Sequence, residues 1–100
     1  MYTVMRHYQG QKELAAELTK HGKEVEKIIS AVPGFLAYFL VNGSDGVTTI
    51  TICENRKGCE ESTKIAADWL KKNLPNLRIT APHVASGEVP LAFDRIHAHA

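Results

Sequence analysis

Hydrophobic positions in this chain follow a strand period in some segments and a helix period in others. Residues 35–41 form the most apolar run and contain two Phe and one Tyr, a composition typical of a β-strand. Pro33 ends the helix before this run, because proline lacks the backbone N–H and disfavours helical geometry in the residue that precedes it. Residues 42–46 (NGSDG) predict a turn, and the β-branched residues 47–53 predict a second strand, so the two strands form a hairpin.

The turn sets the register of this hairpin, and the register sorts its side chains onto two faces. With residues 43–46 in the loop, the predicted pairs are Asn42–Val47, Leu40–Thr49, Tyr38–Thr51 and Leu36–Cys53. The opposite face carries Ala37, Phe39, Val41, Thr48, Ile50 and Ile52. Because the second face is the more apolar, we predict that it lies under helices.

A strand and a helix precede the hairpin. Residues 2–8 alternate, with Tyr2, Val4, Arg6 and Tyr8 on one face and Thr3, Met5 and His7 on the other. A helix is predicted over residues 12–31, since Leu14, Leu18, Val25, Ile28, Ile29 and Val32 keep helical spacing. Gly22 interrupts this stripe at a cost of about 1 kcal/mol relative to alanine, which suggests a bend or a close approach to the sheet.

A second helix and a last strand follow the hairpin. Asn55 is a suitable N-cap and Pro75 ends the helix. Its inner stripe is predicted to be Ser62, Ile65, Ala66, Trp69, Leu70 and Leu74. Residues 76–82 are a connector, residues 83–89 the last strand, and residues 91–100 a tail in which Leu91, Phe93 and Ile96 suggest packing on another surface.

This order predicts one α+β domain over residues 1–100 with the ferredoxin-like βαββαβ fold. Right-handed crossovers place both helices on one face of a four-stranded antiparallel sheet. The other face then carries Leu36, Tyr38 and Leu40, which is too apolar a set to leave in water. A second copy is the simplest cover, so we predict a homodimer through the open sheet face.

Composition narrows the class of partner. A net charge of +1 offers no electrostatic attraction for nucleic acid or an anionic membrane. The sequence has no apolar span of membrane length and no signal-peptide pattern at its start. Cys53 and Cys59 match neither a CxxC motif nor a disulfide framework, so we expect reduced thiols in a cytoplasmic protein.

Particular segments resemble a known family. VPGFLAYFLVN (residues 32–42), ENRKGCEESTKIAADWL (residues 54–70) and Ser86-Gly87-Glu88-Val89 are similar to segments of antibiotic-biosynthesis-monooxygenase-like proteins of the dimeric α/β-barrel superfamily. The resemblance covers about residues 2–89. It implies a dimeric α/β barrel and, for activity, a group that includes cofactor-independent oxygenases of polycyclic aromatics, haem-degrading enzymes and members without known activity.

Trp69, Arg6 and Tyr38 are the candidate substrate-binding residues. In the related oxygenases a Trp on this helix lines a pocket between helix and sheet, a role that the resemblance implies for Trp69, although an inward Trp is also ordinary core. Arg6 is suited to hold a carboxylate or enolate, although strand arginines often form dimer salt bridges. Tyr38 is a hydrogen-bond donor whose predicted face favours the interface. The family's catalytic asparagines are missing, because the first strand has none and Ile65 stands one turn before Trp69.

His7 and His83 are the candidate catalytic acid–base residues, because histidine titrates near neutrality and each lies on a predicted strand. They would flank one pocket if both pointed toward the helices; otherwise they are edge or interface histidines. His97 and His99 have the spacing of half a metal site, but a terminal pair without carboxylates does not predict one. We expect no metal and no cofactor.

Two classes of function remain open from the sequence. One is a cofactor-independent monooxygenase-like enzyme that acts on an aromatic small molecule. The other is a non-catalytic dimeric ligand-binding or stress-related module. A pocket beside Trp69 that contains a polar group favours the first, and a core filled with side chains favours the second.

Overall fold

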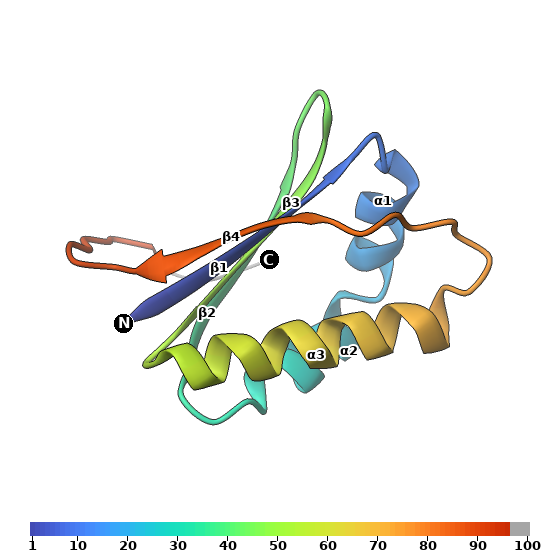
Figure 1. Ribbon diagram of the computed structural model, residues 1–100. Helices are drawn as coiled ribbons and strands as arrows, with labels where there is room; N and C mark the ends of the chain where they lie inside the picture. The colour runs from blue at the N-terminus through green and yellow to red at the C-terminus, as the bar shows by residue number, and fades with distance from the viewer. Residues whose placement is uncertain (97–100) are drawn as a thin grey trace.

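Four antiparallel strands and three helices make up the computed structural model, which describes residues 1–96 (Figure 1). The elements are β1 (Tyr2–Gln9), α1 (Lys12–Lys20), α2 (Gly22–Ser30), β2 (Phe35–Asn42), β3 (Gly46–Cys53), α3 (Arg56–Asn73) and β4 (His83–Glu88). The strand order is β2-β3-β1-β4, and all three neighbouring pairs are antiparallel. The helices pack on one side of this sheet (Figure 1). The ferredoxin-like α+β prediction is therefore confirmed.

The first helical segment is broken where one continuous helix was predicted. His21, with φ −96° and ψ 23°, ends α1 and begins α2. Its backbone serves both helices, because its N–H donates to the Glu17 carbonyl at 3.0 Å and its carbonyl accepts from Val25 N–H at 2.9 Å. The predicted inner stripe is nevertheless confirmed on both sides of the break, where Leu14, Leu18, Val25 and Ile29 are buried.

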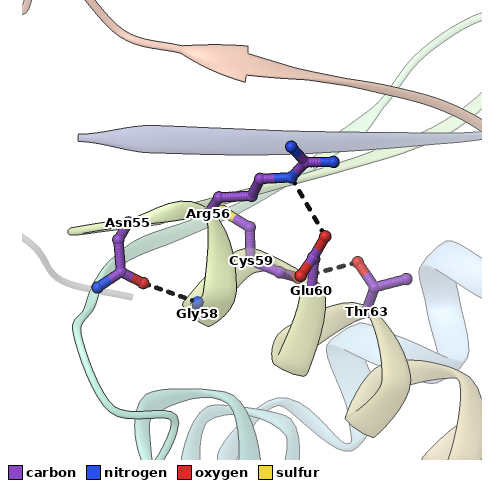
Figure 2. A network of polar contacts seen from close by, with 6 residues as sticks. All are labelled: Asn55, Arg56, Gly58, Cys59, Glu60 and Thr63. Atoms are coloured by element: carbon purple, nitrogen blue, oxygen red, sulfur yellow. Dashed lines mark hydrogen bonds and ion pairs between the residues drawn. The ribbon is translucent and has the colours of Figure 1, made fainter.

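Helix α3 begins as the sequence predicts. Asn55 is its N-cap, and the Asn55 Oδ1 accepts a 3.0 Å hydrogen bond from the Gly58 N–H (Figure 2). Gly58 lies so close to β3 that a Cβ there would be 2.9 Å from the Cβ of Cys53 and 3.1 Å from the carbonyl oxygen of Pro33. The start of α3 is therefore held against the end of β3.

The face prediction for the hairpin is wrong. Val47, Thr49, Thr51 and Cys53 are buried on the helix side, and Tyr38 and Leu40 pack against the core there. On the other side, Phe39 is 37% exposed and Val41 is 47% exposed. The buried face is the more hydroxyl-rich one, and it continues into β1, where Val4, Arg6 and Tyr8 are buried on the same side and Arg6 donates to Thr49 and Thr51. Counting apolar residues on β2 and β3 alone therefore selected the wrong face.

Most of the predicted register is confirmed, with one exception at the start of β2. Asn42, Leu40 and Tyr38 lie opposite Val47, Thr49 and Thr51, as predicted. Cys53, however, lies opposite Phe35 and not Leu36, because the pairing shifts between Phe35 and Ala37. This β-bulge turns Phe35 into the core while Leu36 is exposed.

The side of the sheet without helices is called the open face below. Its side chains form rows that run across the sheet, with one residue from each strand in each row. Phe39, Ile50, Met5 and Ala85 form the central row of cross-strand neighbours. Val41, Thr48, His7 and His83 form the row beside it. Apolar side chains of all four strands therefore share one uncovered surface.

Beneath the sheet, the buried side chains form two clusters. The larger one joins Tyr8, Leu14, Leu18, Val25, Ile29, Trp69 and Leu74. The smaller one holds Val4, Val32 and the free thiols of Cys53 and Cys59. Leu91, Phe93 and Ile96 are exposed, so the described part of the tail does not pack on its own chain. No helix in the described range has the length and apolarity to cross a membrane.

Candidate ligand site between helices and sheet

A small cavity lies between the helices and the sheet beside Trp69, and is called the Trp69 cavity below. Its volume is about 20 Å³, enough for about one water molecule. The lining residues are Arg6, Tyr8, Leu18, Val25, Ile28, Tyr38, Thr49, Ala66, Trp69 and Leu70. Its walls are therefore aliphatic and aromatic, with one guanidinium, one threonine and two phenols as polar groups.

Arg6 supplies the cationic group at this cavity. It is only 2% exposed, because its position on β1 directs it under α3. Its NH1 donates to the Thr49 and Thr51 hydroxyls at 3.3 and 3.4 Å, and its NH2 donates to the Ser62 and Thr63 hydroxyls at 3.0 Å each. Its Nε is buried and has no hydrogen-bond partner in the described residues.

The two α3 hydroxyls are oriented to accept from Arg6. Ser62 Oγ donates to the Cys59 carbonyl at 2.7 Å. Thr63 Oγ1 donates to the same oxygen at 3.0 Å (Figure 2). Because each hydroxyl donates its proton to that carbonyl, the lone pairs of its oxygen can accept hydrogen bonds from the guanidinium. The backbone of α3 thus fixes the position of Arg6.

Neutral groups surround this guanidinium. Within residues 1–96 no carboxylate lies within 4.0 Å of Arg6. Burial lowers the pKa of Arg6, and the nearby Tyr8, Tyr38, Cys59 and Cys53 oppose that shift. A buried cation whose partners are uncharged hydroxyls is unusual, since buried charges are normally paired.

Tyr8 and Tyr38 bring two phenols to the same cavity. Burial raises the pKa of Tyr38 to about 12 and also raises the pKa of Tyr8, while Arg6 opposes both shifts. Both phenols are therefore neutral hydrogen-bond donors near pH 7. The predicted interface position of Tyr38 is wrong, because Tyr38 faces the helices. Tyr8 was not singled out from the sequence, although alternation already placed it on the face of Arg6.

Trp69 forms one wall of the cavity and is 7% exposed. Its Nε1 donates to Glu24 Oε2 at 3.0 Å, which links α3 to α2. The His21 ring meets the indole edge to face, with 5.5 Å between ring centroids, and His21 Nδ1 lies 3.6 Å from Glu24 Oε1. The His21 side chain is partly buried by these contacts, and no sequence signal identifies Glu24.

The candidate catalytic histidines lie elsewhere. His7 and His83 are cross-strand neighbours on the open face, on the opposite side of the sheet from the Trp69 cavity. His7 Nδ1 is 2.8 Å from Thr48 Oγ1, and His7 Nε2 is 3.8 Å from Asp45 Oδ2. The two histidines therefore do not flank this cavity, and a catalytic role for either stays a prediction.

Possible metal ligands occur in the described residues and in the tail. His97 and His99 lie outside the described residues. Within residues 1–96, no group of three or more His, Cys, Asp or Glu side chains is placed to hold a metal.

Comparison with known proteins finds similarity in structure only. No family model and no curated protein sequence matches the chain. The heme-degrader MhuD from Mycobacterium tuberculosis, solved with two hemes in its active site, matches with a TM-score of 0.68 and 18% identity over 94% of this chain and 100% of that one. A monooxygenase from the ActVA-Orf6 gene of Streptomyces coelicolor, in complex with nanaomycin D, matches with a TM-score of 0.64 and 18% identity over 95% and 91%.

A dimeric ferredoxin-like protein from an uncultured marine organism matches with a TM-score of 0.64 and 15% identity over 94% of this chain and 97% of that one. At such identities the likeness shows the fold alone. The fold is that of the ferredoxin-like domains that include monooxygenases and heme degraders. At the level of the fold, the structural similarity agrees with the resemblance seen in the sequence.

Proposed function

We propose that this protein binds an aromatic small molecule in the Trp69 cavity and oxidises it as a monooxygenase-like enzyme. The observation that carries the proposal is the cavity itself, in which an indole, two neutral phenols and a buried guanidinium meet between α3 and the sheet. An ordinary core position would have no need of the guanidinium. The similarity in fold to a monooxygenase solved in complex with nanaomycin D also supports the proposal.

The residues present suit oxidation of a hydroxylated aromatic by O₂ without a cofactor. The overall reaction converts a phenol and O₂ into a quinone and water, and it proceeds more readily from the electron-rich phenolate. Arg6 would favour loss of the ring hydroxyl proton, because a fixed cation stabilises the developing negative charge. Tyr38 would donate a hydrogen bond to the same oxygen, and Trp69 would pack against the ring.

Ligand entry requires the helices to separate, because a volume of about 20 Å³ does not hold an aromatic ring. Val25 and Ile28 of α2 face Ala66 and Trp69 of α3 across the cavity. The hydrogen bond from Trp69 to Glu24 is the polar contact that joins these two helices. Separation of α2 from α3 is therefore the expected opening step.

Haem suits this cavity poorly. Of the usual axial ligands, its lining offers only Tyr8 and Tyr38. Their raised pKa values disfavour the phenolate that binds iron. The first strand also lacks the asparagine of the haem-degrading pattern. We therefore do not extend haem degradation to this chain.

Assembly through the open face completes the proposal. The row Phe39, Ile50, Met5 and Ala85 is uncovered in a single chain, and a second copy would bury it sheet to sheet. A dimeric ferredoxin-like protein among the similar structures supports the formation of a dimer. The Trp69 cavity lies on the other side of the sheet, so each copy would keep its own site.

The test combines binding with oxygen consumption. Native mass spectrometry with a panel of hydroxylated polycyclic aromatics should show one ligand per chain, and O₂ uptake should match quinone formation one to one. Trp69→Ala should lose both signals, while Arg56→Gln, which removes an exposed arginine of α3, should keep both. Binding without O₂ uptake would favour the non-catalytic binding module, and no binding by any compound would overturn the proposal.

A further inference from the structure

We propose that the Trp69 cavity is a receptor for an anion, whose ligand presents one negatively charged oxygen to Arg6 from an apolar aromatic body. The inference rests on the proposed function in placing a ligand there, and it deepens that function by assigning the charge of the ligand. Arg6 is then the counter-ion of the bound ligand. Phenolates, enolates and aromatic carboxylates share the required chemistry.

Arg6 lacks a negatively charged partner among the described residues. Arg6 is 2% exposed and all four of its hydrogen-bond partners are uncharged hydroxyls. Hydroxyl groups satisfy N–H donors but leave the positive charge unneutralised, which is costly away from water. An anion that enters the cavity would supply that charge without displacing the existing partners.

Within the described residues, the side chains next to Arg6 do not supply the missing negative charge. Tyr8 and Tyr38 keep their protons near neutral pH because burial raises the pKa of each. Burial and the adjacent Cys59 raise the pKa of Cys53 to about 11, so this thiol is neutral as well. Glu24, the carboxylate next to Trp69, accepts from the indole N–H, and its side chain is about half exposed to solvent.

The arrangement of the N–H donors of Arg6 also favours a single anionic oxygen. NH1 and NH2 are both held by hydroxyls, and those of Ser62 and Thr63 are fixed by the Cys59 carbonyl. Nε is buried and has no hydrogen-bond partner within residues 1–96. A guanidinium fixed in this way is preorganised and has one N–H to offer, which suits a single oxyanion better than the bidentate grip used for phosphate.

The apolar lining of the Trp69 cavity limits the kind of anion that can bind there. Apart from Arg6 and Thr49, every lining side chain is aliphatic or aromatic. Burying an ionic head group against these walls is favourable only where Arg6 meets it, and the rest of the ligand must be apolar. A small, strongly hydrated anion such as inorganic phosphate is therefore excluded on desolvation grounds.

Three naphthalene probes of equal ring size test the inference by calorimetry. These are 2-naphthoate, 2-naphthol and neutral 2-naphthalenemethanol. We expect the wild type to bind 2-naphthoate at least tenfold more tightly than the alcohol, and to shift the pKa of bound 2-naphthol downward in its absorption spectrum. A naphthol shift without naphthoate binding would assign the site to phenolates, and the reverse would assign it to carboxylates.

Variants of Arg6 locate the effect. Arg6→Met should abolish the preference for the anion, Arg6→Lys should retain part of it, and Arg56→Gln should leave it intact. If Arg6→Met does not fold, the inference is still tested by comparing how strongly the wild type and Arg6→Lys prefer the anion over the alcohol. Equal affinity of the wild type for alcohol and anions, or a preference that survives in Arg6→Met, would overturn the inference while leaving the ligand site in place. Failure of all three probes to bind the wild type would overturn both the inference and the proposed ligand site.

Discussion

The indole Nε1 of Trp69 donates a 3.0 Å hydrogen bond to the Oε2 of Glu24, and this contact ties α3 to α2 beside the Trp69 cavity. Trp69 is the single tryptophan of the chain. Its fluorescence therefore reports directly on the cavity wall. Because Glu24 is about half exposed while Trp69 is buried, the contact can open without unfolding the core.

Removing the Glu24 carboxylate should loosen this wall. Glu24→Ala leaves the indole N–H without its partner, and we expect a loss of about 1 kcal/mol in unfolding free energy and a red-shifted emission. Glu24→Gln keeps an acceptor and should change both less. Glu26→Ala alters an exposed glutamate on the same helix and is the control. Identical emission from all three variants would show that the bond does not hold Trp69.

Glycine at position 58 is required by close packing. An alanine Cβ there would lie 2.9 Å from the Cys53 Cβ and 3.1 Å from the Pro33 carbonyl oxygen, so Gly58→Ala should destabilise the protein by about 1–3 kcal/mol. Gly22→Ala meets nothing within 4 Å and should be neutral or stabilise α2 by about 0.5 kcal/mol. Urea denaturation of both variants checks the pair. A Gly58→Ala variant as stable as Gly22→Ala would contradict the packing.

Alkaline pH should destabilise the protein through Tyr38. Its pKa rises from the ordinary 10.0 to about 12 on folding, so the unfolded chain loses the phenol proton first. The stabilisation is fully present below pH 10.0 and is lost as pH rises toward about 12, roughly 2–3 kcal/mol in all. Tyr38→Phe should lose less stability than the wild type over this window in urea titrations. Equal losses would place the Tyr38 hydroxyl in water.

A charge in the central row of the open face should prevent dimerisation. Phe39→Lys places an ammonium group beside Ile50 where the proposed partner would pack, and desolvating it is costly. We expect a monomer by sedimentation at micromolar concentration with unchanged secondary structure. Ala67→Lys, an exposed position on α3, is the matched control and should leave the dimer intact. A dimer that survives Phe39→Lys would assign the interface to another surface.

Local signals in the chain were sufficient for most of the element boundaries. Pro33 and Pro75 end helices because proline cannot donate to them, and Asn55 caps α3 because its side chain reaches the Gly58 N–H. The break at His21 was predicted only as a bend near Gly22, since its exact place depends on packing over the sheet.

The candidate site was predicted in part. Trp69 and Arg6 were predicted to be substrate-binding residues, and the structure brings both to one cavity. Tyr38 joins them from the face that was predicted to be open. His7 and His83 lie on the other face, because strand alternation puts successive side chains on opposite sides of the sheet.

The sequence by itself determined the order of elements, the hairpin register next to the turn and the sharing of faces within each strand, because these depend on period, turn residues and caps. Only the tertiary structure decided which face of the sheet the helices cover. On the covered face, Arg6 of β1 donates to the hydroxyls of Thr49 and Thr51 of β3 and of Ser62 and Thr63 of α3. Because these contacts join segments that lie far apart in the chain, no local count of apolar residues records them.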